Sequence, residues 1–235
     1  MNNSTVHLQP AFILRHKKYR ESSVIVDVLT KDFGIVSILA RGVRKKKSKI
    51  AGLLLAFTAL KISYIGKHEL KILTHIEIDL PTIQLNGLSL YCGFYVNELI
   101  TYFLHKDDPH PEVFNQYLQC LVMLGDSNDI EETLRFFELN LIETIGYGVQ
   151  LNRDANNDSK INPTTNYLFR GEKGMVESPD GYISGLTLLA MDARESLDKQ
   201  ALYEAKQLMR QIIDFQLQGK KLKSRAVLAK IINQL

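Results

Sequence analysis

The chain has 235 residues, of which 45% are hydrophobic and 23% are charged, and its net charge is +3. This length allows one large or two modest domains, and the composition is that of a folded protein rather than a disordered one. No apolar run reaches the roughly 18 residues of a membrane-spanning helix, and Met1–Thr5 lacks the cationic start of a secretory signal. We therefore expect an intracellular, cytoplasmic protein without membrane contact.

The charged residues are distributed unevenly along the chain. Residues 1–80 carry 14 Lys/Arg against 6 Asp/Glu, residues 81–200 carry 8 against 18, and residues 201–235 carry 7 against 2. A basic head, an acidic body and a basic tail indicate contact with nucleic acid or a membrane surface more strongly than the overall pI does. The alternative is that the lysine runs are solvated loops with no specific ligand.

The first 80 residues have the pattern of short strands. Residues 22–30 are rich in β-branched side chains, and Lys31–Gly34 supplies a turn with glycine where a positive φ is needed. The expected strands are at residues 11–14, 22–30, 35–40, 56–64 and 69–79. Short antiparallel strands with no covering helix predict a small closed barrel such as an OB fold, and an SH3-like barrel would fit nearly as well.

Two expected loops of this barrel contain most of its cations. Residues 15–20 join the first two strands, and residues 41–49 join the third and fourth. OB folds bind oligonucleotides across strands 2 and 3 and through such loops, where cations attract phosphate and aromatic rings stack on bases. Tyr19 and Phe33 are candidate stacking residues, with packing at the barrel rim as the alternative. The candidate DNA-binding residues here are Arg15, Lys17, Lys18, Tyr19, Arg20, Arg41, Arg44, Lys45, Lys46, Lys47 and Lys49.

From residue 86 onward the apolar residues recur with a helical period. Helices are expected at about 88–104, 112–124, 131–145, 187–191, 199–217 and 224–233. Asn128 with Glu131 resembles a cap before the third helix, and Gly146 is well placed to end it.

Residues 147–182 are rich in Gly, Asn, Asp and Pro, which predicts irregular structure with a small hairpin around Tyr167–Phe169 and Gly174–Val176. Tyr167, Phe169 and Met175 are its expected anchors. The sequence thus predicts an α+β protein with a five-stranded OB-fold barrel domain at 1–80. A mainly α-helical domain at 81–235 follows, with an irregular insert at about 147–183.

Recognisable enzyme signatures are missing from the sequence: there is no glycine-rich phosphate loop, nucleophile elbow or paired-histidine helix motif. The segment His105–Glu112 gathers histidines and acidic residues that would suit a metal-dependent hydrolase or nuclease. A polar, proline-bearing connection between two helices needs the same residue types. Cys92 and Cys120 lie in apolar helical patterns, where a free thiol acts as a small hydrophobe. We predict no catalytic residue, no metal and no cofactor.

The basic segment near the end of the chain is a further candidate contact. Its cations either extend the nucleic-acid path or cap and solvate the last helix. They are Lys220, Lys221, Lys223 and Arg225.

The sequence resembles the RecO family of bacterial recombinational-repair proteins over nearly its whole length. The similar segments are Tyr19–Ser23, Leu29-Thr30 followed by Gly34, Ala40–Arg44, Tyr95–Leu99, Arg135–Leu139, Ile145–Gly148 and Leu222–Arg225. Each segment is short, but their shared order and spacing argue against chance agreement.

The resemblance implies an N-terminal OB fold, a helical C-terminal domain and a protein that is not a metabolic enzyme. Such a protein binds single- and double-stranded DNA and anneals complementary strands. With RecR, it helps RecA replace single-strand-binding protein on DNA, so we expect it at the nucleoid during repair. The basic loops by themselves leave open an RNA- or ribosome-binding barrel, because phosphate attraction is common to both nucleic acids.

The resemblance also implies that the helical domain binds the acidic, hydrophobic C-terminal tail of single-strand-binding protein. Arg135 would then pair with a tail carboxylate, and the alternative is a surface cation paired with Glu131 one turn earlier. Many family members hold zinc with four cysteines after the Gly-Tyr-Gly motif. Residues 147–182 contain no cysteine, so zinc is not expected.

Overall fold

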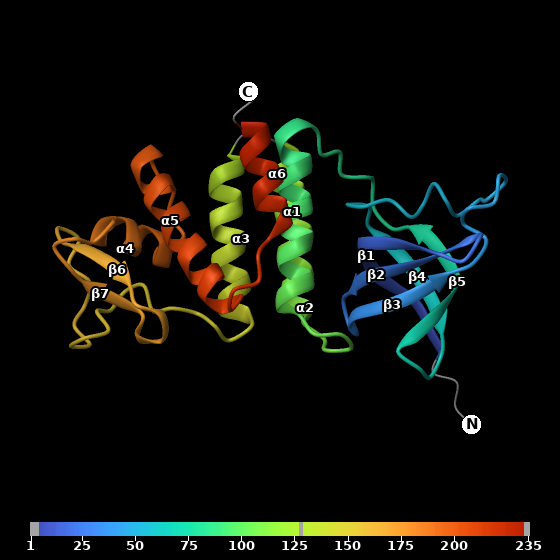
Figure 1. The fold of residues 1–235 in the computed structure, drawn as a ribbon, viewed down its shortest axis with the longest axis horizontal. Coiled ribbons are helices and arrows are strands. Elements are labelled where there is room, and N and C mark those ends of the chain that lie inside the picture. The colour runs from blue at the N-terminus through green and yellow to red at the C-terminus, as the bar shows by residue number, and fades with distance from the viewer. Residues whose placement is uncertain (1–4, 127–128, 233–235) are drawn as a thin grey trace. The chain divides into compact units, whose positions relative to one another are not determined.

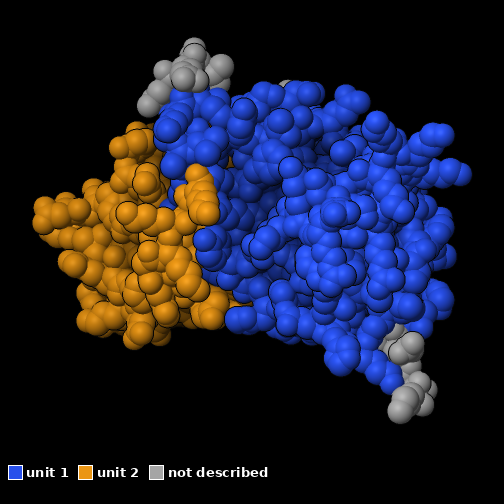
Figure 2. All heavy atoms as spheres, turned by 45° about the vertical axis from the view of Figure 1, so that its right-hand side comes forward, with its two compact units in different colours: residues 1–126, 224–235 blue, residues 127–223 orange. Residues whose placement is uncertain are grey.

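The computed structural model describes residues 5–126 and 129–232, and the chain divides into two compact units (Figure 2). Unit 1 comprises residues 1–126 and 224–235, and unit 2 comprises residues 127–223. Compactness thus groups the first two helices and the end of the chain with the barrel. The two compact units do not test where the domains begin and end, so the expected domain boundary at residue 80 stays a prediction.

A closed five-stranded barrel forms the first part of unit 1 (Figure 1). Its strands are β1 (Thr5–Tyr19), β2 (Ser23–Thr30), β3 (Gly34–Ala40), β4 (Leu60–Ile65) and β5 (Leu70–Ile78). They follow the order β1-β2-β3-β5-β4, and β1 and β4 close the barrel. The α+β class with an N-terminal barrel is confirmed. One expectation was wrong in detail, since β3 and β5 pair in parallel and only the other pairs are antiparallel.

Alternate residues of the strands fill the barrel, as the period of two requires. The inward side chains of β2 are Val24, Val26 and Val28, and those of β3 include Val36 and Ile38. Branched side chains suit this position because they pack well on a pleated surface. Each fully buried valine or isoleucine contributes roughly 1.5–3 kcal/mol relative to an exposed one.

The opposite, outer face of the same strands is covered at one end. Phe12, Leu29 and Ile35 are successive partners across β1, β2 and β3, and all three are buried. The helix α2 (Pro111–Asp126), which follows α1 (Gly87–Phe103) in the chain, covers Phe12, because the centroid of the Phe12 ring lies 5.3 Å and 5.0 Å from those of Phe114 and Tyr117. This row joins the barrel to α2.

A β-bulge in β1 is satisfied by a side chain of α1. The register with β2 shifts between Ile13 and Arg15, so Leu14 is the extra residue. Its carbonyl accepts a hydrogen bond from Asn97 Nδ2 at 3.0 Å, and Asn97 Oδ1 accepts one from the Tyr117 hydroxyl at 2.7 Å. Asn97 and Tyr117 are buried. One amide therefore connects β1, α1 and α2.

Two further contacts complete unit 1. The amide of Asp107, in the connection between α1 and α2, donates to the carbonyl of Ile35 at 3.1 Å. Gly34 has φ +66°, and a Cβ there would lie 2.1 Å from the carbonyl oxygen of Asp108, so the turn requires glycine. The last helix, α6 (Lys223–Ile232), begins where the backbone and hydroxyl of Ser224 both donate to the Glu98 carboxylate.

Unit 2 contains helices and a three-stranded sheet, in which β6 (Asn166–Phe169) lies between β7 (Met175–Glu177) and β8 (Ile183–Ser184); β6 and β7 are labelled in Figure 1. The expected hairpin is confirmed, with Tyr167 and Met175 buried and Phe169 against the Phe215 ring at 5.8 Å. The elements are α3 (Ile130–Thr144), β6 (Asn166–Phe169), a 3₁₀ turn (Gly171–Lys173), β7 (Met175–Glu177), β8 (Ile183–Ser184), α4 (Gly185–Ala193) and α5 (Lys199–Gln216).

Three local expectations differ from the structure. Residues 15–19 are not a loop but the end of β1, paired with β2 as far as Tyr19 and Ser23. The fourth strand begins at Leu60 rather than at residue 56. The expected cap residue Asn128 lies outside the described residues, and Asp129 is the N-cap of α3 without a side-chain cap hydrogen bond.

We predict that Asn97→Ala lowers the free energy of unfolding by about 2–4 kcal/mol, because it leaves the Leu14 carbonyl and the Tyr117 hydroxyl buried without this partner. Urea unfolding of the whole chain measures the change. The matched control is Asn115→Ala, at an exposed position of α2, which should change the free energy by less than about 0.5 kcal/mol. Equal stability of the two variants would contradict the role given to Asn97.

Candidate nucleic-acid interface

The two basic segments meet at one end of the barrel. Tyr19 pairs with Ser23 across β1 and β2, and Val24 pairs with Ala40 across β2 and β3, so β1 and β3 both end there. The backbone of Arg44 donates to the carbonyl of Ser22 at 3.0 Å, and its Nη1 donates to the carbonyl of Arg20 at 3.1 Å. Segments that are 20 residues or more apart in the sequence therefore form one basic surface.

We call this surface the basic end of the barrel and define it by its exposed cations. They are Lys17, Lys18, Arg20, Arg41, Arg44, Lys45, Lys46, Lys47 and Lys49. Tyr19 lies among them and is half-buried, with the Arg20 guanidinium 5.3 Å from its ring centroid. This cation–π contact holds Arg20, which has φ +50°, beside the ring. One face of Tyr19 is therefore occupied by its neighbour.

Arg15 is held on the outer face by an ion pair with Asp27, its cross-strand partner. Asp27 also accepts a hydrogen bond from the Ser37 hydroxyl on β3. Burial opposes ionisation of Asp27, but the hydrogen bonds from Ser37 and Arg15 outweigh it, so the pKa of Asp27 lies below its ordinary value. Sequence reasoning missed Asp27, although an acidic residue inside a β-branched run was a signal for it.

Two other predicted contacts, Phe33 and Arg225, have aromatic partners within unit 1. Phe33 lies in the turn at the opposite end of the β2–β3 hairpin, where its ring and that of Tyr64 form a T-shaped pair with 6.3 Å between their centroids. Arg225 lies in unit 1 with its guanidinium 5.9 Å from the Tyr95 ring centroid. Lys220, Lys221 and Lys223 are exposed and belong to unit 2. Their contact with nucleic acid stays a prediction.

Arg135 is a buried residue rather than a surface cation. Its Nη2 donates to Glu138 at 2.8 Å, and the two side chains are 10% and 1% exposed. Glu131, the expected partner, instead pairs with Lys206 at 2.9 Å. The alternative reading of Arg135 as a solvated partner of Glu131 was therefore wrong. Within the described residues, its buried Nε has no hydrogen-bond partner.

The segment His105–Glu112 connects α1 and α2 and packs on the barrel. His110 pairs with Asp108 at 3.2 Å, and Lys106 pairs with Glu69 at 2.6 Å. Over residues 5–126 and 129–232, no group of three or more His, Cys, Asp or Glu side chains is arranged to hold a metal ion. In the same residues, no helix is both long and apolar enough to span a membrane.

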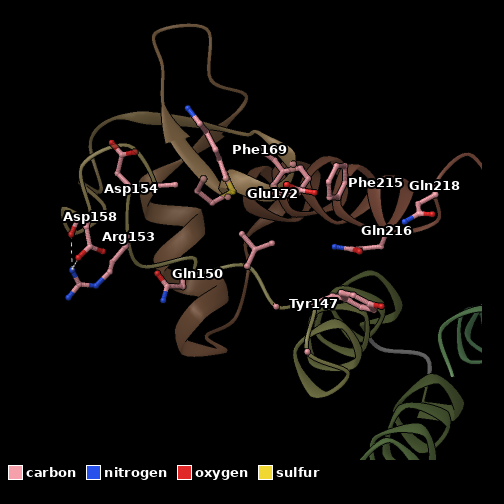
Figure 3. A pocket seen from close by; sticks show the side chains of 18 residues that line it. Tyr147, Gln150, Arg153, Asp154, Asp158, Phe169, Glu172, Phe215, Gln216 and Gln218 are labelled. Carbon is pink, nitrogen blue, oxygen red and sulfur yellow. Dashed lines mark hydrogen bonds and ion pairs between the residues drawn. The ribbon is translucent and has the colours of Figure 1, made fainter. Parts of the chain in front are cut away.

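Unit 2 contains a cavity of about 890 Å³ beside the sheet (Figure 3). Phe169 and Phe215 line one part of it, and the ion pair of Arg153 with Asp158 lies at another. Its charged lining residues are Arg153 and Lys173 against Asp154, Asp158 and Glu172. Because the carboxylates outnumber the cations, this cavity does not suit a nucleic-acid backbone.

Comparison with known proteins gives the same family for both halves of the chain. A family model described as "Recombination protein O N terminal" matches residues 1–80, and one described as "Recombination protein O C terminal" matches residues 84–226. A "DNA repair protein RecO" of Dechloromonas aromatica is 39% identical, covering 95% of this chain and 96% of the relative. Relatives of the same name from Methylococcus capsulatus and Haemophilus influenzae are 39% and 37% identical, covering 94% and 93% of this chain and 93% and 94% of themselves.

We predict that Asp27→Asn lowers the free energy of unfolding at pH 7 by about 1–2 kcal/mol, because charge-assisted hydrogen bonds are lost. The lowered pKa of Asp27 means that its contribution is present at neutral pH and disappears as the pH falls through the folded-state value. The difference between the variant and the wild type should therefore shrink between pH 5 and about pH 2. Urea midpoints across this range measure it, with the exposed Asp126→Asn as the control, and a pH-independent difference would contradict the assignment.

Proposed function

The chain belongs to the RecO family of DNA repair proteins, and on that premise we propose that it is a DNA-binding recombination mediator and not an enzyme. It binds single- and double-stranded DNA, anneals complementary strands and, with RecR, assists RecA loading on DNA coated with single-strand-binding protein. Its place is the cytoplasm, at the nucleoid during repair.

The observation that carries this proposal is the basic end of the barrel. Arg44 joins the turn at Arg20–Ser22 to the lysine loop, so that cations from two segments share one surface. A surface of this kind attracts phosphate without reading sequence. A protein that anneals DNA needs to bind strands of any sequence, because the bases of the two strands recognise each other and the protein does not read them.

Strand annealing also requires that two polyanions approach one another. Lys45, Lys46 and Lys47 are exposed in the loop after β3, and cations there offset the mutual repulsion of the two backbones. No bond is made or broken in this process, so that no nucleophile or general base is needed. Binding alone supplies the activity.

Arg135 supports the proposed uptake of the single-strand-binding protein tail. Its buried Nε, which lacks a partner within the described residues, is a donor suited to a carboxylate. The pair with Glu138 fixes the guanidinium through Nη2, and the family resemblance makes a tail carboxylate the candidate partner of Nε. RecR and RecA are partners proposed from the family alone.

We predict that replacing Lys45, Lys46 and Lys47 together by alanine weakens binding to single-stranded DNA and slows annealing. If each lysine meets one phosphate, the slope of log affinity against log salt becomes less steep by about 2. Fluorescence anisotropy with a labelled oligonucleotide measures this change in slope, at salt concentrations from about 50 to about 300 mM.

The matched control removes the same charge from unit 2, by alanine at the exposed Lys160, Lys173 and Lys199. Its salt slope should equal that of the wild type. If the affinity of the wild-type protein for single-stranded DNA did not depend on salt, the proposal would be contradicted. Competition with an RNA oligonucleotide of the same sequence separates the DNA reading from the RNA-binding alternative.

A second prediction concerns the partner tail. Arg135→Lys should weaken binding of an Asp-rich peptide with an aromatic C-terminal residue by about ten-fold, because lysine lacks the planar fork. Calorimetric titration of the full chain measures the affinity, and thermal unfolding verifies the fold. Arg210→Lys, at an exposed position of α5, should bind the peptide normally, and equal affinity of both variants would contradict the role of Arg135.

A further inference from the structure

The loop between β3 and β4, residues 41–59, packs into the barrel instead of extending into solvent. Val43 and Leu54 are buried and belong to the core cluster of the barrel, and we call these two residues the core anchors. Between them lies the basic run, residues 44–49, whose cations are all exposed. The loop therefore contributes apolar side chains to the barrel core on both sides of its cations.

Hydrogen bonds also shape the backbone of the basic run. The amide of Lys45 donates to the carbonyl of Gly42 at 3.2 Å, and the amide of Ser48 donates to the carbonyl of Lys45 at 3.0 Å. The run begins at Arg44, which is bonded to the β1–β2 turn, and it is followed by Ile50, which packs against the core cluster. A short segment that is fixed at both ends has little conformational entropy left to lose when it binds a ligand.

Phe57 fastens the far end of the loop to α1. Its side chain is 4% exposed, and its ring forms a T-shaped pair with that of Phe94, with 5.0 Å between the centroids. The backbone of Phe57 has φ +62°. A residue with a Cβ adopts such a conformation only where the surrounding structure holds it. The contact of Phe57 with α1 therefore compensates a strained turn in the loop.

The position of the Phe57 ring depends on a glycine in the interior of α1. Gly93 is buried, and a Cβ there would lie 2.9 Å from two atoms of the Phe57 ring and 2.6 Å from Leu85 Cδ1. Glycine weakens the interior of a helix, so its presence in α1 has a packing reason. It gives the ring space against the helix. A methyl group at Gly93 would displace the ring and release this end of the loop without changing a charge.

We propose that Val43, Leu54 and Phe57 are positioning residues, which hold the loop on the barrel and on α1 so that the basic run is ordered before nucleic acid binds. An ordered set of cations binds a phosphate backbone more tightly than the same cations on a flexible loop, because less conformational entropy is lost. The inference rests on the DNA-binding function proposed above, and it assigns to that function three residues that carry no charge.

The test releases the loop at either end and keeps all of its cations. Leu54→Ala removes a core anchor, and Gly93→Ala displaces the Phe57 ring. We expect each variant to bind a labelled single-stranded oligonucleotide about ten-fold more weakly, because the released loop must be ordered on binding. The slope of log affinity against log salt should equal that of the wild type, since every cation is retained. Fluorescence anisotropy measures both quantities.

Trypsin cleavage after the lysines of the basic run reports the order of the loop in the absence of DNA. Proteases cut backbone that lacks tertiary contacts. The run should be cut slowly in the wild type and about ten-fold faster in both variants, at a temperature where thermal unfolding shows that each protein is folded.

Neighbouring positions supply matched controls. Leu55→Ala makes the same change one residue after the core anchor, where the side chain is exposed. Gly52→Ala adds the same methyl group where its Cβ would meet nothing within 4 Å. Both should keep wild-type affinity and resistance to trypsin. Leu54→Ile preserves the volume of the anchor and should also keep both, and Gly93→Ala tests the inference by itself if Leu54→Ala does not fold.

Three results would overturn the inference. Wild-type affinity in a variant whose loop trypsin cuts rapidly would mean that the order of the basic run does not matter for binding. Equally fast cleavage of the wild type and both variants would mean that these residues do not hold the loop. A shallower salt slope in the variants would mean that cations had lost their phosphate contacts instead of their order. If the wild type itself shows no salt-dependent binding, the proposed function fails, and the trypsin assay still decides whether the three residues hold the loop.

Discussion

Asn97 donates to the bulge carbonyl of Leu14 and accepts from the hydroxyl of Tyr117, and the arrangement of unit 1 depends on these two hydrogen bonds. The bulge gives β1 an extra residue, so that Arg15 and Lys17 fall on the outer face while Phe12 stays packed against α2. A carbonyl left unpaired in this buried position would cost about 1–3 kcal/mol. One buried amide thus sets where the covered part of the face ends and where the charged part begins.

The cations of this protein do not have equal roles. The side chain of Arg15 is ion-paired with Asp27, and that of Arg44 donates a hydrogen bond to the carbonyl of Arg20. These two side chains therefore shape the surface and are only partly available to a ligand. Lysines 45–47 have exposed side chains and long, flexible stems. Arginine serves the fixed positions because its planar fork makes several directed hydrogen bonds, whereas lysine suits a backbone that moves past it.

Much of this fold could be predicted from the sequence, because alternation and helical period are local signals. Runs such as residues 22–30 and the turn at Gly34 identified the hairpin, and the helical stripes identified α1, α2 and α5. The pairing of Lys17 with Ile25 could not be predicted from the sequence, because a run of cations shows no alternation of apolar residues. Its backbone nevertheless continues the pairing of β1 with β2. The contact of Arg44 with Arg20 likewise depends on tertiary packing, and the spacing of residues in the sequence does not predict it.

Unit 1 contains residues that precede unit 2 in the sequence and residues that follow it. The Glu98 carboxylate near the middle of α1 receives the N-terminus of α6 through Ser224, which follows it by 126 residues. During synthesis the barrel, α1 and α2 leave the ribosome first, and α6 follows only after the whole of unit 2. Until then the Glu98 carboxylate lacks the two hydrogen bonds that Ser224 donates. The docking of α6 on α1 is therefore a long-range step within unit 1, and it follows the synthesis of the residues of unit 2.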